Sequence, residues 1–442
     1  MGCPLPGSPF FSNTLSCALL QIEFELMELY YSLSILIVIA SLFAFLNIKI
    51  LKLPSSIGIM LIALVSSALL VFVGHLFLPK TLEHISNLIG GVDFTDVLMG
   101  AMLNFLLFAG AIHIHVNDLR EQRAPIVIFA TISVVISTIV IGYLLYFVLP
   151  LLGISLSLIY CLLFGALISP TDPIAVLSIL KKAKVNKSLE TKIAGESLFN
   201  DGIAIVVFTI LLSIAKGTDE TINAGTVSWL ILKEAGGGIL LGLILGFTAS
   251  KAIKSIDDYI VTVLITLSVV MGGYLIAHEL HISGPLTMVL AGLIIGNVGK
   301  KVSMSAPTRE YVEKFWELID EILNAVLFLL IGLELMVIPE LNKFWISGIL
   351  SFVLVIAARF VSIWLPTRLR AFRKKFSAQT IKILVWGGLR GGVSIALALS
   401  IPDVAGKNSV VAITYIVVVC SILIQGLSIN KLANKNTNTV EV

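Results

Sequence analysis

The stretch Glu196-Ser-Leu-Phe-Asn200-Asp201-Gly-Ile-Ala-Ile-Val-Val-Phe208 sets two carboxylates and an amide at the head of an apolar helix. At about 100° per helical residue, Glu196 and Asn200 share one stripe, and Ser197 and Asp201 share the stripe beside it. Carboxylate, carbonyl and hydroxyl oxygens suit hard monovalent cations and protons. Because a charged side chain inside a bilayer costs about 2.5 to 3.5 kcal/mol even on lenient scales, the patch predicts a functional site.

The composition around this patch is that of a membrane protein. Of 442 residues, 57% are hydrophobic and only 13% are charged, which excludes an ordinary soluble domain. The four cysteines lack the spacing of a metal site or a redox motif. No nucleophile and base pair, metal cluster or phosphate loop lies at the polar positions, so we expect no enzyme activity, no cofactor and no nucleic-acid partner.

The apolar runs predict an all-α polytopic protein. Each run is long enough to cross a hydrocarbon core of about 30 Å. Thirteen spans are predicted, at about 30–50, 55–78, 97–115, 124–149, 155–180, 192–215, 227–249, 257–278, 282–299, 318–337, 343–366, 381–401 and 408–428. Residues 1–29 are expected to be an N-terminal extension or tail, with Met27 as an alternative start, and residues 429–442 a short cytoplasmic tail.

The distribution of basic residues predicts the orientation. Most of the 30 Lys and Arg residues fall in the loops after odd-numbered spans and in the C-terminal tail. Positive residues stay in the cytoplasm, so we expect an outside N-terminus and a cytoplasmic C-terminus in the inner or plasma membrane. Arg359 and Arg390 are exceptions, because both lie inside predicted spans.

The fifth predicted span contains Ser169-Pro170-Thr171-Asp172-Pro173. Two prolines remove two backbone donors and disfavour helix at the residues before them, so the helix must break here. Broken membrane helices expose backbone carbonyls and mark substrate sites in many transporters. Asp172 lies at this break. The alternative is a simple proline kink in which Asp172 caps the second half of the helix.

The twelfth predicted span contains Gly387-Gly388-Leu389-Arg390-Gly391-Gly392. Glycine weakens a helix and allows close backbone approach, which predicts a second break. Two broken helices in corresponding halves of a chain indicate an inverted repeat, with the two helices crossing at the ion site. Arg390 would place a fixed positive charge near the carbonyl ends at this crossing. The alternative is an arginine that snorkels to the cytoplasmic edge.

Glu196 needs a positive partner inside the membrane. Arg359 is the preferred partner, in which case Glu196 and Arg359 form a structural ion pair and Asp201 is the titrating group. Arg390 is the alternative partner.

These motifs together resemble the monovalent cation:proton antiporter-1 family, and in particular its bacterial sodium/proton antiporters of the NhaP type. The resemblance runs from about Met27 to Ser428. It rests on Ser169 to Pro173, Glu196 to Gly202, Phe328-Leu-Leu-Ile-Gly-Leu-Glu334, and Gly387 to Gly392. The Asn200-Asp201 pair resembles the signature of the electroneutral members of the family.

The resemblance implies a homodimer with an inverted-repeat antiporter domain over residues 30–428. Its core helices would cover about 124–215 and 343–428, and a dimerisation scaffold would cover about 30–115 and 257–337. Asp201, Asp172 and Ser197, with the backbone near Thr171, would hold Na⁺. Asn200 would be held in place by Glu196 and an arginine.

The expected function is electroneutral exchange of Na⁺ or Li⁺ for H⁺, by competition for Asp201 and alternating access. One positive charge would be exchanged for another, so the membrane potential would not drive the cycle. No residue of the sequence separates sodium from potassium, so potassium/proton antiport is the nearest alternative. A gated cation channel is a second alternative, from another class of function.

Overall fold

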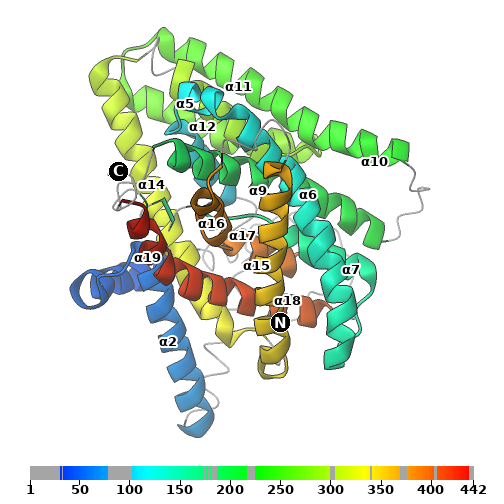
Figure 1. Cartoon of the computed structure of the whole chain (residues 1–442). Coiled ribbons are helices and arrows are strands. Elements are labelled where there is room, and N and C mark those ends of the chain that lie inside the picture. Colours follow the sequence, from blue (N-terminus) through cyan, green and yellow to red (C-terminus); the bar gives the residue numbers. More distant parts are fainter. Residues whose placement is uncertain are drawn as a thin grey trace, which may run out of the picture.

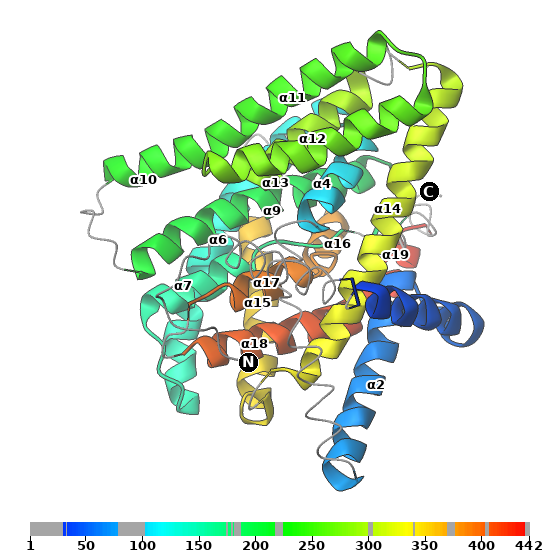
Figure 2. The same ribbon diagram turned by 180° about the vertical axis from the view of Figure 1, so that it is seen from behind.

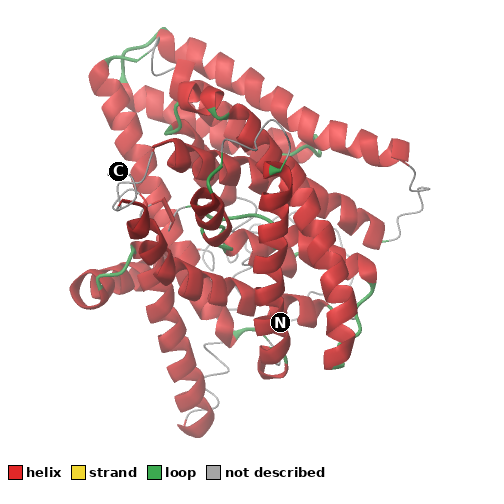
Figure 3. Ribbon diagram, viewed as in Figure 1, coloured by secondary structure: helices red, strands yellow, loops and turns green. Residues whose placement is uncertain are grey.

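The computed structural model describes residues 30–31, 33–77, 102–173, 176–177, 180, 187–216, 224–298, 304–338, 341–368, 376–402 and 406–437 (Figure 1). These residues are almost entirely helical (Figure 3). They contain no strand, and their one isolated β-bridge joins Asp172 to Leu389. The predicted all-α class is therefore confirmed.

The first half of the chain forms a series of apolar helices. They are a helix over Leu33–Leu51 that ends in the π-helix η1 (Asn47–Leu51), α2 (Ser55–Phe77), α4 (Leu103–Ile112), α5 (Val116–Glu121), α6 (Arg123–Val148), the 3₁₀ turn η3 (Leu149–Leu152), α7 (Leu158–Leu167) and α9 (Lys187–Ala215). The extension predicted for residues 1–29 lies outside the described residues.

The second half continues the series. Its elements are α10 (Ala224–Ile231), the π-helix η4 (Leu232–Gly236), α11 (Gly237–Lys254), α12 (Tyr259–Glu279), α13 (Gly284–Ile294), α14 (Ala306–Leu333), the 3₁₀ turns η6 (Glu334–Met336) and η7 (Leu341–Lys343), α15 (Trp345–Thr367), α16 (Ala378–Trp386), α17 (Gly392–Leu399), α18 (Lys407–Cys420), the π-helix η8 (Ser421–Gln425) and α19 (Gly426–Thr437).

Every predicted span contains a helix in the described part of the chain. Among the described residues, eight helical segments are long and apolar enough to cross a membrane, and α4, α7 and the helix over Gly284–Val298 are shorter apolar helices. Of these three short helices, only α7 borders a predicted break, because it ends just before Ser169–Pro173. Helices α4 and α13 are short without lying at a predicted break. The count of thirteen spans, the inverted repeat and the division into core and scaffold stay predictions.

The tenth predicted span differs from its helix. We predicted 318–337, but α14 begins at Ala306. Its first turns are amphipathic and exposed on one side, and Lys314 forms an ion pair of 2.7 Å with Glu310 there. Such i,i+4 pairs support a helix that a search for apolar runs does not detect.

Helix α9 lies between two buried apolar clusters. The larger cluster joins residues of α2, α7, the second half of α14 and α15 to α18. The second joins α4, α12, α13 and the first half of α14. Leu189 and Phe208 of α9 belong to the first cluster and Leu198 to the second. Figures 1 and 2 show α11 and α12 along one side of the molecule, α2 extending from another, and α16 and α17 near the middle of both views. The polar stretch of α9 is thus enclosed by protein.

Candidate functional site

The two predicted breaks lie against each other. Helix α7 ends at Leu167, and α16 and α17 are separated by residues 387–391. The backbone N–H of Asp172 donates a 2.8 Å hydrogen bond to the carbonyl of Leu389. Backbone that is freed from helical pairing needs another partner inside a protein. The second break therefore supplies a hydrogen-bond acceptor to a backbone N–H of the first break.

Two glycines of the second break make room for their neighbours. A Cβ atom on Gly391 would lie 2.9 Å from Cβ of Asp172 and 3.1 Å from its Oδ2. A Cβ atom on Gly388 would lie 2.8 Å from Nε of Arg359. Such distances are shorter than ordinary van der Waals contact, so only glycine fits without a local shift.

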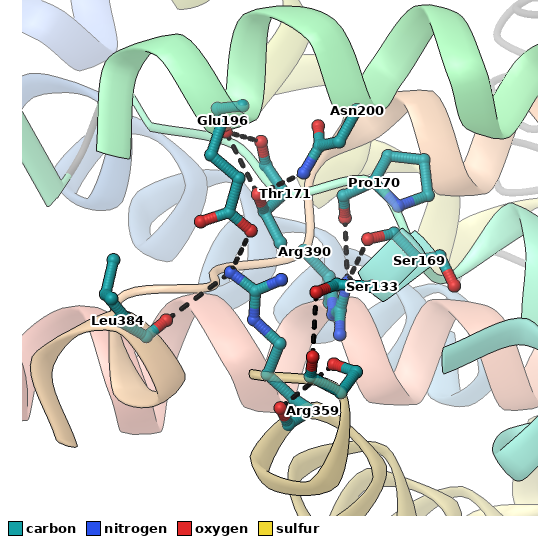
Figure 4. Close-up of polar contacts among 11 residues, drawn as sticks. Ser133, Ser169, Pro170, Thr171, Glu196, Asn200, Arg359, Leu384 and Arg390 are labelled. Carbon is teal, nitrogen blue, oxygen red and sulfur yellow. Dashed lines mark hydrogen bonds and ion pairs between the residues drawn. The ribbon is translucent and has the colours of Figure 1, made fainter. Parts of the chain in front are cut away.

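Thr171 connects the first break to α9. The hydroxyl of Ser197 donates to the Thr171 carbonyl and lies 3.0 Å from Thr171 Oγ1. Nδ2 of Asn200 donates to Thr171 Oγ1 over 2.7 Å. All three residues are buried, and Oδ1 of Asn200 has no hydrogen-bond partner among the described residues. Within the described part of the chain, Asn200 thus bonds to Thr171, whereas the resemblance implied Glu196 and an arginine as its partners (Figure 4).

Glu196 lies against Arg359 of α15. The distance from Glu196 Oε1 to Arg359 Nη2 is 2.5 Å, and both side chains are buried. Nη2 also donates to the Leu384 carbonyl in α16 over 3.4 Å. Arg359 therefore joins three helices next to the breaks (Figure 4). Of the two arginines considered from the sequence, Arg359 is the one that contacts Glu196.

Arg390 points into the first break. Its Nη1 donates to the carbonyls of Ser169, over 2.6 Å, and Pro170, over 3.0 Å (Figure 4). The residue is only 1% exposed, so it does not snorkel to an aqueous edge. The geometry places its charge at the carbonyl of Ser169, whose helical donor would be the N–H that Pro173 lacks, and at the adjacent carbonyl of Pro170.

Asp201 and Asp172 are half-buried and interact electrostatically with each other. Asp201 follows directly after the Ser197–Asn200 turn of α9, so these side chains share one region of the helix. Together with Ser197 and Thr171, the two aspartates bring carboxylate, hydroxyl and carbonyl oxygens to the meeting point of the breaks. Hard cations prefer such oxygens.

Asp320 of α14 is a residue that the sequence reasoning did not single out, because it lies near the start of the predicted span 318–337. It interacts electrostatically with Asp172. Asn324, four residues later, is 3% exposed. An acid and an amide at i,i+4 on an amphipathic helix share one face. This spacing could have indicated that Asp320 and Asn324 lie together on one polar face of the helix.

Comparison with known protein families shows which family the chain belongs to. The model of the family described as "Sodium/hydrogen exchanger, transmembrane" matches residues 36–435. The chain belongs to the sodium/hydrogen exchanger family. The chain is therefore a multi-pass membrane protein, and its family is one of transporters. The sequence motifs predicted both.

Named relatives cover nearly the whole exchanger chain. It is 48% identical to the Na⁺/H⁺ antiporter NhaP of Pseudomonas aeruginosa over 407 residues, which are 90% of this chain and 95% of the relative. It is 35% identical to the Na⁺/H⁺ antiporter NhaH of Halobacillus aidingensis over 393 residues, which are 88% of this chain and 93% of the relative.

A solved structure shares the fold of this exchanger. The sodium proton antiporter MjNhaP1 from Methanocaldococcus jannaschii matches with a TM-score of 0.74 and 22% identity, over 93% of this chain and 98% of that chain. At this identity the match shows the fold alone. The antiporter fold that the motifs predicted is confirmed.

Proposed function

We propose that this chain is a secondary active antiporter that exchanges Na⁺ or Li⁺ for H⁺. The observation that carries the proposal is the meeting of two broken helices at Asp172 and Leu389, beside the carboxylate of Asp201. The names of the relatives, which cover nearly the whole chain, support the choice of sodium and proton as substrates.

In this proposal, Asp201 is the group for which Na⁺ and H⁺ compete. Asp172, Ser197 and the Thr171 backbone supply the other oxygens to the cation. Asn200 fixes Thr171 through the 2.7 Å hydrogen bond to Oγ1, so that the carbonyl of the same residue keeps its place. The transported ion is a substrate here and not a resident cofactor.

Two arginines balance the acids of the site. Glu196 is paired with Arg359, and Arg390 faces the carbonyls of the first break. Among the acids of the first break and of α9, the three residues Glu196, Asp172 and Asp201 exceed the two arginines by one negative charge. One proton or one monovalent cation neutralises that charge. The core can then cross the membrane when it carries either ion, whereas the uncompensated charge holds back the empty core.

Exchange of one charge for one charge is electroneutral. A net charge that crosses the membrane would gain or lose about 2.3 kcal/mol per 100 mV, whereas a balanced exchange gains nothing. The two concentration gradients alone would drive the cycle. We place the protein in the inner or plasma membrane as a homodimer, with the N-terminus outside and the C-terminus in the cytoplasm; the distribution of Lys and Arg supports this orientation.

The experiment is an assay of the purified protein in proteoliposomes that contain a pH dye. Na⁺, Li⁺ and K⁺ are added in turn, with and without a clamped voltage, to wild type and to Asp201→Asn. We expect Na⁺ and Li⁺ to move protons through the wild type only, at a rate independent of voltage. Movement with K⁺ alone would replace sodium by potassium as the substrate.

A passive cation channel is the competing class of function. It would conduct without proton coupling, so a current through the purified protein in a planar bilayer would favour it. Normal exchange by Asp201→Asn would contradict competition at that carboxylate.

A further inference from the structure

The last long apolar segment is interrupted by the π-helix η8, Ser421–Gln425. Both end residues of this turn are polar and buried, with exposed fractions of 0% for Ser421 and 3% for Gln425. Single π-helical turns inside α-helices are rare and occur frequently at functional sites. Neither residue belongs to the site described above.

Ser421 and Gln425 hold both ends of the second break. The backbone N–H of Arg390 donates to Ser421 Oγ over 3.0 Å. Ser421 Oγ in turn donates to Gln425 Oε1 over 2.6 Å. The Nε2 atom of Gln425 donates to the carbonyl of Trp386 over 3.2 Å. The two side chains therefore bridge the last residue of α16 and the arginine of the break.

The break requires such partners. Because α16 ends at Trp386 and α17 begins at Gly392, the Trp386 carbonyl and the Arg390 N–H lack the helical partners that a continuous helix would give them. A buried backbone group without a hydrogen-bond partner destabilises the folded protein. Gly426, which directly follows η8, also packs here, because a Cβ atom on it would lie 3.7 Å from Cδ1 of Leu389.

The same short segment reaches the ion site. The Leu389 carbonyl accepts from the backbone N–H of Asp172, and the Arg390 guanidinium donates to the carbonyls of Ser169 and Pro170. A shift of residues 389 and 390 would therefore displace the backbone on either side of Thr171. The hydrogen-bonded route runs from Gln425 through Ser421 and Arg390 to the first break.

We propose that Ser421 and Gln425 are positioning residues for the ion site: they fix the second break, and through Leu389 and Arg390 they fix the oxygens that bind the cation. They act through other residues and do not touch the ion. The proposal rests on the proposed function of the site.

The test compares Ser421→Ala and Gln425→Met with wild type in proteoliposomes. Each change removes one part of the bridge at nearly constant volume. We expect the Na⁺ concentration for half-maximal exchange to rise about tenfold, which corresponds to about 1.4 kcal/mol. We expect the ratio of the Na⁺ and Li⁺ half-maximal concentrations to change as well, while the maximal rate stays within about twofold of wild type, since the ion ligands remain. Ser421→Thr keeps the hydroxyl and should restore the wild-type value.

Thr414→Ala is the matched control, since Thr414 is a buried residue of α18 whose hydroxyl donates to the Val410 carbonyl of its own helix. It should leave the half-maximal concentration unchanged. An unchanged value in both test variants, with or without a lower melting temperature, would overturn the proposal, as would an equal rise in Thr414→Ala. If one test variant does not fold, the other decides. A wild type without cation-driven proton movement would instead refute the proposed function.

Discussion

The backbone N–H of Asp172 donates a 2.8 Å hydrogen bond to the carbonyl of Leu389, and this bond joins two helix breaks from opposite halves of the chain. The contact places the Asp172 side chain of one break beside Gly391 of the other. A change on either side of this contact should therefore act on the ion site.

Substitution of Asp201 by asparagine should abolish exchange and leave the fold intact. The amide keeps the size of the side chain but cannot carry the negative charge for which, in the proposed mechanism, cation and proton compete. The measurement is the proteoliposome dye assay together with a thermal melt. Glu310→Gln is the control, because Glu310 lies in an exposed pair with Lys314, and such pairs contribute only about 0–1 kcal/mol.

Alanine in place of Gly391 should impair transport more than stability. The added methyl group would press on Cβ and Oδ2 of Asp172, so we expect the half-maximal Na⁺ concentration to rise by about tenfold, equivalent to about 1.4 kcal/mol. Gly272→Ala is the matched control, since among the described residues no atom outside the local backbone of its own helix lies within 4 Å of the position that the added methyl group would take. It should transport normally and stabilise α12 by about 0.5–1 kcal/mol. Equal behaviour of the two variants would refute the role of close approach at Gly391.

Removal of one partner of the Glu196–Arg359 pair should destabilise the protein. Both side chains are buried and 2.5 Å apart, and a buried charge that loses its partner costs about 3–5 kcal/mol. Glu196→Gln and Arg359→Met should therefore each lower the melting temperature strongly. The double variant should lose less than the sum of the two single effects, because neither charge is then left alone. Additive single effects would show that the pair is not coupled.

Substitution of Asp320 by asparagine should weaken cation affinity and leave the maximal rate unchanged. Asp320 interacts electrostatically with Asp172, so its charge adds to the negative potential that attracts a cation to the site. We expect a rise of about threefold in the half-maximal Na⁺ concentration, which is larger at low ionic strength. An effect on the maximal rate alone would exclude this electrostatic role.

Local sequence chemistry was enough to predict the breaks. Pro170 and Pro173 remove two backbone donors within four residues, which disfavours a continuous helix, and the glycines from 387 to 392 weaken a helix through their backbone freedom. Two arginines within apolar spans predicted pairing with buried acids, because an arginine stays charged and needs acceptors.

Relations between helices could not be predicted in the same way. Only the packing of α9, α15 and α16 shows that Arg359 contacts Glu196 while Arg390 contacts Ser169 and Pro170. Asp320 was missed because its helix is amphipathic and its first turns resemble a solvated loop. Sequence alone did not indicate a role for Ser421 and Gln425, because they lie in an apolar span and their partners lie far away along the chain, in Arg390 and Trp386.

The position of Arg390 has a consequence for selectivity. Its guanidinium is a permanent cation that already occupies the carbonyls of Ser169 and Pro170. Those two oxygens are thus withheld from any ion that enters, and the coordination shell offered by the first break is reduced to Thr171 and Asp172. In the proposed site only Ser197 and Asp201 add to these two residues, so we expect water to fill the remaining positions and a bound cation to keep part of its hydration.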